Sequence, residues 1–191
     1  MKYKFILVVV VMLGIFILVV TIFTHQRKTE MVANEDKEKL VLIEDIQKKV
    51  WAIDFEKNYQ TKVLNNEKFL DHMTDGGGQL TGYFKDGQIN KVVEWLGLSY
   101  GTKTFNYYFF DGRLILVNEK EEDFPDISNS GTLDYTKVEF AFEGNYYFNE
   151  EKLIDQKTNG QKRFSEGVKI DEEVLFLKTS KQNVELLTRQ N

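Results

Sequence analysis

Residues 76–120 read GGGQLTGYFKDGQINKVVEWLGLSYGTKTFNYYFFDGRLILVNEK. One pattern occurs twice in them: two aromatic residues, a spacer, Asp-Gly, a polar or basic residue and an apolar residue. The two copies run from Tyr83 to Ile89 and from Tyr108 to Leu114. Asp-Gly between two apolar runs favours a two-residue β-hairpin turn, because a type I′ turn needs positive φ at both central residues. The sequence therefore predicts a chain of β-hairpins.

A third, degraded copy runs from Tyr147 to Leu153. Glu150-Glu151 stands there in place of Asp-Gly, so we expect a wider turn. Strands are expected over 79–84, 88–98, 103–110 and 113–119, with a loop over 125–131 before the third hairpin. Val138, Phe140 and Phe142 alternate with charged residues and predict a further strand. Asn159-Gly160 offers another hairpin turn.

Two helices are expected to flank these strands. Asn34 is a suitable N-cap for the first, in which Ile43, Ile46, Val50 and Ile53 recur at helical spacing. That apolar stripe is typical either of a helix packed on a sheet or of a short coiled-coil seam. Asp171 is a suitable N-cap for a C-terminal helix. Residues 54–75 are polar and favour no particular element.

The predicted fold class is α+β. We expect an N-terminal transmembrane helix and an amphipathic helix, then an antiparallel meander of six or seven strands and a C-terminal helix. Neighbouring strands in sequence are usually neighbours in a sheet. One face of the sheet should be covered by a helix and the other should expose aromatic side chains.

Residues 5–23, FILVVVVMLGIFILVVTIF, carry no charge. At 1.5 Å per residue such a helix is about as long as the ~30 Å hydrocarbon core of a bilayer. A secretory signal peptide has a shorter apolar core, followed by a cleavage site with small residues. The apolar segment here is longer and the residues after it offer no such site, so we expect an uncleaved anchor. Lys2 and Lys4 precede the apolar segment and favour an N-terminus inside the cell. If the leader is cleaved, the domain is secreted instead.

The expected organisation is a signal anchor at 1–24, a stalk at 25–34 and an extracytoplasmic domain at 35–191. The expected location is the bacterial cytoplasmic membrane, crossed once, with the bilayer as partner of residues 5–23. A net charge of −5 opposes nucleic-acid binding, which needs a basic surface. The absence of cysteine excludes disulfides, thiol nucleophiles and Cys-based zinc sites.

The aromatic doublets are the most specific feature. Adjacent residues of a strand point to opposite faces, so each doublet sends one ring into the core and one to the other face. If the hairpins are in register, Tyr83, Tyr108 and Tyr147, with Trp95 nearby, form a stacking platform for a glycan, peptide or protein ligand. The alternative is cross-strand aromatic packing with hydroxyl hydrogen bonds.

No catalytic constellation, metal site or cofactor motif is visible in the sequence. The nearest candidate for an envelope hydrolase is His72, which has Asp71 and Asp75 beside it. Three glycines at 76–78 precede a strand rather than a helix, unlike a phosphate-binding loop. We therefore expect a binding or interaction domain, with a hydrolase or a structural or inhibitory partner-binding protein as alternatives.

The runs TDGGGQLTGYFKDGQINKVVEWLG, YYFFDGRLILVNEK and GNYYFNEEKLID resemble a family of uncharacterised bacterial exported or envelope proteins. Members of that family repeat Tyr-Phe-x-Asp-Gly-x-Leu hairpins behind an N-terminal helix. The likeness is good over residues 76–120 and weaker over 143–155, and the hairpins more loosely resemble membrane-occupation-type repeats. The resemblance implies a hairpin fold and export and implies no activity.

Overall fold

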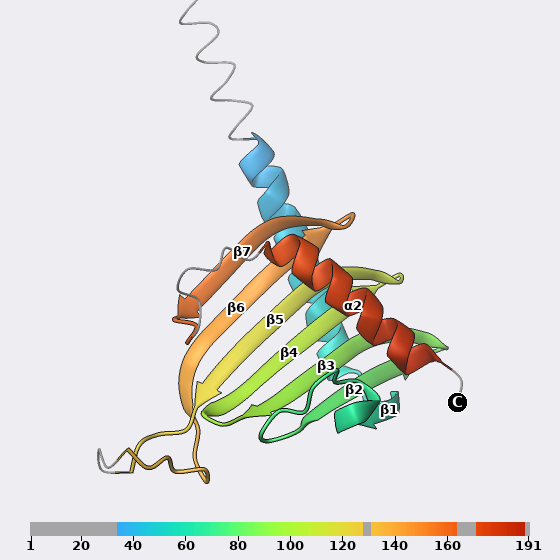
Figure 1. Cartoon of the computed structure of the whole chain (residues 1–191). Coiled ribbons are helices and arrows are strands. Elements are labelled where there is room, and N and C mark those ends of the chain that lie inside the picture. Colours follow the sequence, from blue (N-terminus) through green and yellow to red (C-terminus); the bar gives the residue numbers. More distant parts are fainter. Residues whose placement is uncertain (1–33, 128–130, 164–170, 190–191) are drawn as a thin grey trace, which may run out of the picture. The chain divides into compact units, whose positions relative to one another are not determined.

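The computed structural model describes residues 34–127, 131–163 and 171–189. The chain divides into two compact units, residues 1–42 and 43–191. In the first unit, the described residues 34–42 are helical. The second unit begins with helical residues 43–55, named here the 43–55 helix, and contains a single antiparallel sheet (Figure 1).

The sheet has seven strands in the order β1-β2-β3-β4-β5-β6-β7, so each strand pairs with its sequence neighbour. The predicted antiparallel meander and C-terminal helix are therefore confirmed. A short 3-10 helix, η1 (Asn66–Lys68), follows β1. The strands are β1 (Gln60–Asn65), β2 (Gly78–Lys85), β3 (Gln88–Leu98), β4 (Gly101–Phe110), β5 (Arg113–Asp123), β6 (Glu139–Asn149) and β7 (Lys152–Gly160), and the C-terminal helix is α2 (Glu172–Thr188).

Some expectations about the ends of the sheet need correction. β1 lies within residues 54–75, for which the sequence favoured no particular element. Its sequence QTKVLN alternates only weakly between polar and apolar residues, because β1 is an edge strand that pairs with β2. Gly160 ends β7 rather than turning a further hairpin, since the next amide, that of Gln161, donates to the carbonyl of Ala141 on the neighbouring strand. The predicted insertion between the second and third hairpins is confirmed by the connection of residues 124–138.

The three repeated turns have the same geometry. The central residues have φ of 52° and 76° at Asp86-Gly87, 49° and 73° at Asp111-Gly112, and 50° and 61° at Glu150-Glu151. The wider third turn predicted from Glu-Glu was therefore wrong. Non-glycine residues at positive φ cost about 1–2 kcal/mol each. The exposed ion pair between Glu151 and Lys181 of α2, 2.7 Å long, contacts this turn and offsets only part of that cost.

Each repeated hairpin also carries a β-bulge at the same place. The register shifts between the two aromatic residues of each copy, and the returning strand contributes one extra residue. Those extra residues are Asn90, Ile115 and Ile154. Ile115 and Ile154 belong to one hydrophobic cluster, whereas the Asn90 side-chain oxygen is buried and has no hydrogen-bond partner among the residues that the structure describes.

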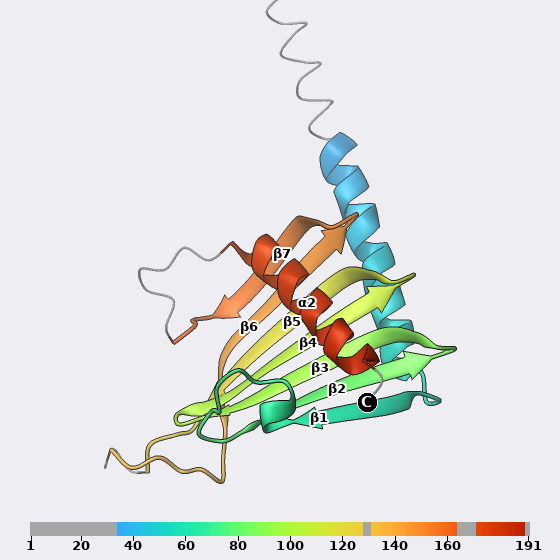
Figure 2. The same ribbon diagram turned by 45° about the vertical axis from the view of Figure 1, so that its right-hand side comes forward.

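Both faces of the sheet carry a helix, so the expectation of one open aromatic face was wrong. Phe176 and Leu187 of α2 pack on one face with Leu80, Val92, Tyr107, Phe109, Val117, Tyr146 and Phe148. Ile43, Ile46 and Ile53 of the 43–55 helix pack on the other with Tyr108, Ile115, Leu116 and Tyr147. α2 crosses the sheet diagonally, and the 43–55 helix lies on the opposite side, beside the hairpin turns (Figure 2). The apolar stripe of the first helix thus packs on the sheet.

Within the part of the chain that the structure describes, neither helical segment has the length and apolar composition needed to cross a membrane. The predicted anchor, residues 1–24, and most of the predicted stalk lie outside the described residues.

Substituting Asn90→Ile should stabilise the protein. Ile occupies the equivalent position of the other two hairpins, and a buried polar group without a partner costs about 1–3 kcal/mol. We expect a gain of about 1 kcal/mol, seen as a midpoint of thermal unfolding that rises by roughly 2–4 °C. The reverse change, Ile115→Asn, should destabilise the protein. An unchanged or lowered midpoint for Asn90→Ile would contradict the equivalence of the three bulges.

Candidate functional site

The three tyrosines proposed as a platform lie in one row across the sheet. Tyr83 pairs with Lys91, Lys91 with Tyr108, Tyr108 with Leu116, and Leu116 with Tyr147. The register that the platform requires is therefore present.

The same row, however, lies beneath the 43–55 helix. Tyr108 and Tyr147 are only 6% and 5% exposed. The Tyr108 hydroxyl donates to Asp54 over 3.1 Å, and Gln47 donates to the Tyr147 hydroxyl over 3.2 Å. Burial, reinforced by Asp54, raises the pKa of the Tyr108 phenol. These two rings pack against the helix and offer no open stacking surface.

The other two predicted residues are separate from that buried pair. Tyr83 is half-buried and its ring meets Tyr59 edge-on, with centroids 5.8 Å apart. Trp95 lies on the same face of the sheet, four residues further along β3 from Lys91, a distance of about 13 Å along the strand. With 37% of its surface exposed, Trp95 is the predicted aromatic residue that remains most open to solvent.

Trp95 belongs to the half of this face that the 43–55 helix leaves uncovered, named here the open face. Its central feature is a ladder of asparagines on three adjacent strands. Asn106 donates to Asn118 and Asn118 donates to Asn145, over 3.2 and 3.1 Å. The residues of the open face, from β1 to β6, are Val63, Asn65, Gln79, Thr81, Val93, Trp95, Thr104, Asn106, Asn118, Lys120, Glu143 and Asn145.

Trp95 belongs to the row of paired residues that lies next to this ladder on the sheet. Thr104 pairs with Trp95 across the sheet, Lys120 pairs with Thr104, and Glu143 pairs with Lys120. Asn118 also donates to Glu143 over 3.1 Å, which links the two rows. The open face thus places one large apolar ring beside amides, a hydroxyl and two opposite charges. Such a surface can stack on a ligand ring and both donate and accept hydrogen bonds.

The asparagine ladder was missed from the sequence, although a signal for it exists. Asn-Tyr-Tyr-Phe occurs twice, at 106–109 and 145–148. In each copy the asparagine stands two residues before the second tyrosine. It therefore lies on the same face of the sheet as that tyrosine, towards the exposed end.

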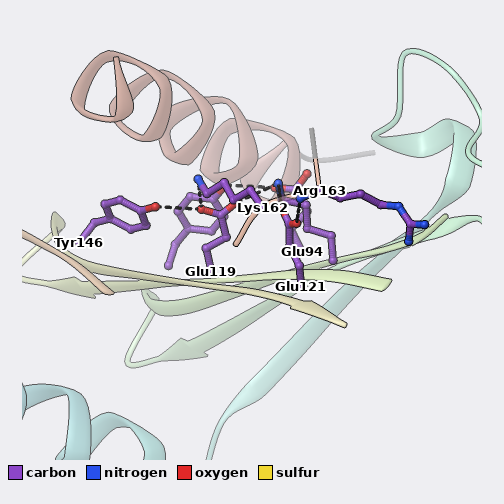
Figure 3. A network of polar contacts seen from close by, with 8 residues as sticks. Glu94, Glu119, Glu121, Tyr146, Lys162 and Arg163 are labelled. Atoms are coloured by element: carbon purple, nitrogen blue, oxygen red, sulfur yellow. Dashed lines mark hydrogen bonds and ion pairs between the residues drawn. The ribbon is translucent and has the colours of Figure 1, made fainter. Parts of the chain in front are cut away.

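The opposite face carries an ionic network between the sheet and α2 (Figure 3). Its centre is Glu119 of β5, whose side chain is 2% exposed. The carboxylate pairs with Lys103 at 2.8 Å and Lys162 at 2.7 Å, and the Tyr146 hydroxyl donates to it over 3.1 Å. Burial acts to raise the pKa of Glu119, but the two ammonium groups outweigh it and hold that pKa below its ordinary value.

The network extends towards the end of β5. Lys103 also pairs with Glu121 at 2.6 Å, and Arg163 pairs with Asp123 at 3.1 Å. Arg163 lies over the ring of Tyr100, 4.8 Å from its centroid. Residues 161–163, which follow β7, are thereby fastened across the ends of β4 and β5. The charges of these side chains neutralise one another, and we assign the network a structural role.

Glu94 of β3 is a different member of the same region. The Tyr107 hydroxyl and the Asn183 amide of α2 donate to its Oε2 atom over 3.3 and 3.0 Å. It has no ion pair with any described residue. Burial raises the pKa of the Glu94 carboxyl, and the two hydrogen bonds and the more distant Lys103 only partly oppose this.

His72, the nearest candidate for catalysis in the sequence, is exposed in the loop between η1 and β2. Its side chain makes no hydrogen bond or ion pair with the described residues. No group of three or more possible metal ligands occurs among residues 34–127, 131–163 and 171–189. The structure does not bring His72 together with a nucleophile or a buried carboxylate.

Substituting Glu119→Gln should lower stability at pH 7 by about 3 kcal/mol, because the ammonium groups of Lys103 and Lys162 both lose the buried carboxylate that they share. A carboxyl whose folded pKa lies below the ordinary 4.5 stabilises the protein above that value and loses this effect as the pH falls through the folded pKa. The variant should therefore lose less stability than the wild type between pH 5 and acid.

Denaturant unfolding at several pH values checks this expectation. Glu122→Gln is the matched control, because Glu122 pairs with the exposed Lys120 at 2.6 Å. Such exposed pairs contribute about 0–1 kcal/mol. Equal losses for the two variants would contradict the central place given to Glu119.

The chain matches no family model, no curated protein and no solved structure. Its function must therefore be argued from the open face and from the region around Glu94.

Proposed function

We propose that the chain is a membrane-tethered extracytoplasmic domain that binds an extended polar ligand, of the glycan class, on the open face. The observation that carries this proposal is the exposed ring of Trp95 beside the asparagine ladder. The ring of Trp95 is 37% exposed, so an apolar surface that can stack on a ligand lies beside groups that can hydrogen-bond it.

The chemistry of the open face favours a glycan. Asparagine amides both donate and accept hydrogen bonds, as sugar hydroxyls do. The flat indole of Trp95 suits the apolar face of a sugar ring. A net charge of −5 disfavours strongly anionic polymers, whereas Lys120 and Glu143 suit a neutral or mixed-charge ligand.

The tether rests on the sequence. Residues 5–23 are uncharged and long enough to span a bilayer, and Lys2 and Lys4 precede them. A membrane-held domain meets surface polymers at high local concentration, so even a weak individual site would be useful.

A protein partner is the second candidate, and one observation favours it. The connection of residues 124–138 between β5 and β6 is longer than that of residues 66–77 between β1 and β2, and the other connections between neighbouring strands have two residues. It exposes Ile127, Tyr135 and Val138 by 48%, 66% and 46%. Long connections in compact domains are usually functional.

Substituting Trp95→Ala should weaken ligand binding about tenfold or more, as truncating a central aromatic residue of a binding site usually does. The full-length chain in lipid nanodiscs is applied to an array of neutral glycans and peptidoglycan fragments, and the affinity of each bound glycan is then measured.

Trp51 provides a matched control, because it is the other tryptophan and is 62% exposed on the 43–55 helix. Trp51→Phe should bind normally and leaves Trp95 as the single tryptophan, whose fluorescence should change with ligand. Equal binding by Trp95→Ala, or an array without any bound glycan, would remove the glycan proposal. The second result would favour the protein partner.

The tether has its own test. The full-length chain should stay in the membrane pellet after alkaline carbonate extraction, and alkaline phosphatase fused to its C-terminus should be active. Two arginines within the apolar segment, Val10→Arg with Ile15→Arg, should release the protein, because each costs about 2.5–3.5 kcal/mol in a bilayer. An extractable wild type or an inactive fusion would contradict the proposed location.

A further inference from the structure

Glu94 and Glu119 occupy the same position in successive hairpins. Glu94 follows Lys91 by three residues and Glu119 follows Leu116 by three, and Lys91 and Leu116 both belong to the row of tyrosines. Each carboxylate accepts a hydrogen bond from the inward tyrosine of the next hairpin, Tyr107 or Tyr146. The repeat therefore builds one kind of carboxylate site twice on the face that α2 covers.

The two sites differ in what balances their charge. Glu119 receives the ammonium groups of Lys103 and Lys162. Glu94 receives only neutral donors, Tyr107 and Asn183, from the described residues. The opposite directions of their pKa shifts have this cause: two ammonium groups lower the pKa of Glu119, while burial raises that of Glu94. A partly buried carboxylate without a cation is costly, and a cation beside it would be stabilising.

Glu94 also differs from Glu119 in being reachable. It forms part of the wall of a groove of about 480 Å³ between α2 and the segment that follows β1. Phe69, Leu70 and Leu186 give that groove an apolar side, and Thr179, Gln182 and Asn183 give it neutral polar groups. The remaining lining residues are charged: Glu67, Lys68, Asp71, Glu185 and Arg189.

We propose that this groove binds a small ligand with a primary ammonium group on an aliphatic stem, and that the ammonium pairs with Glu94 as Lys103 and Lys162 pair with Glu119. An ammonium group has three donors, which can reach the Glu94 carboxylate and neighbouring acceptors together. The aliphatic stem packs on Phe69 and Leu70. This site lies on the opposite face of the sheet from the open face, so the proposal does not depend on whether the open face binds a glycan.

Binding should depend on pH in a defined direction. The ammonium needs the ionised carboxylate, so affinity should rise as the pH rises through the folded pKa of Glu94, which burial has raised. The other titratable or charged groups around the carboxyl are Tyr107 and Lys103 from β4, Glu67, Lys68 and Asp71 from the segment after β1, and Glu185 and Arg189 from α2.

The test uses the full-length chain in nanodiscs and 1,4-diaminobutane as probe, with affinity measured by calorimetry from pH 5 to 8. Glucosamine and lysine amide are added as separate arms, because a free amine, an amino sugar and a peptide side chain share the same ammonium chemistry. At least one probe should bind the wild type, more tightly at higher pH. Glu94→Gln should weaken that binding about tenfold or more, since hydrogen bonds to charged groups contribute about 1.5–3 kcal/mol.

Two further variants keep the outcome decisive. Gln182→Trp fills the groove from an exposed position of α2, so it should abolish binding even if Glu94→Gln folds poorly. Glu44→Gln removes an exposed carboxylate of the 43–55 helix, which lies on the other face of the sheet from the groove, and should bind the probes normally. The proposal is overturned if none of the probes binds the wild type at millimolar concentration, or if Glu94→Gln and Gln182→Trp bind as tightly as the wild type.

Discussion

The structure depends on one backbone constraint, the two-residue turn with positive φ at both positions followed by a β-bulge. The turn fixes the register of each hairpin, and the bulge then shifts it by one residue between the two aromatic side chains. Tyr108 and Phe109 lie on opposite faces by the ordinary alternation of a strand, and the bulge places Ile115 together with Leu116 on the face of Tyr108. Because this device is used three times, equivalent residues fall in the same rows across seven strands.

The repeated hairpins share their backbone geometry but differ in the side chains at equivalent positions. The bulge position holds isoleucine in two copies and asparagine in one, and the inward carboxylate is neutralised at Glu119 but not at Glu94. The scaffold tolerates these differences because turn and bulge are set by the backbone, independently of what the side chains do further along the strand. Departures from the repeat are therefore where a function specific to one hairpin should be sought.

The sequence was sufficient for the meander and for its turns where Asp-Gly supplied residues that accept positive φ. It was insufficient at Glu150-Glu151, where local preference opposes the turn and tertiary contacts, including that of Glu151 with Lys181, support it. Period-2 alternation correctly separated the two faces but does not reveal which face a helix will cover. For that reason Tyr108 and Tyr147 were expected on an open surface and are buried, while the asparagine ladder was overlooked.

The extent of the open face follows from dimensions. The 43–55 helix runs across the strands, since its Gln47 contacts Tyr147 of β6 and its Asp54 contacts Tyr108 of β4. A helix is about 10–12 Å wide, whereas the 11-residue strands β3, β5 and β6 are about 36 Å long at 3.3 Å per residue. One such helix leaves part of the face uncovered, and a solvated sheet face ordinarily carries polar side chains. The asparagines, Thr104 and Lys120 fit that rule and would be needed for solubility alone. Trp95 is the large aromatic side chain among them, and its partly exposed indole is the surface on which we propose that the ligand stacks.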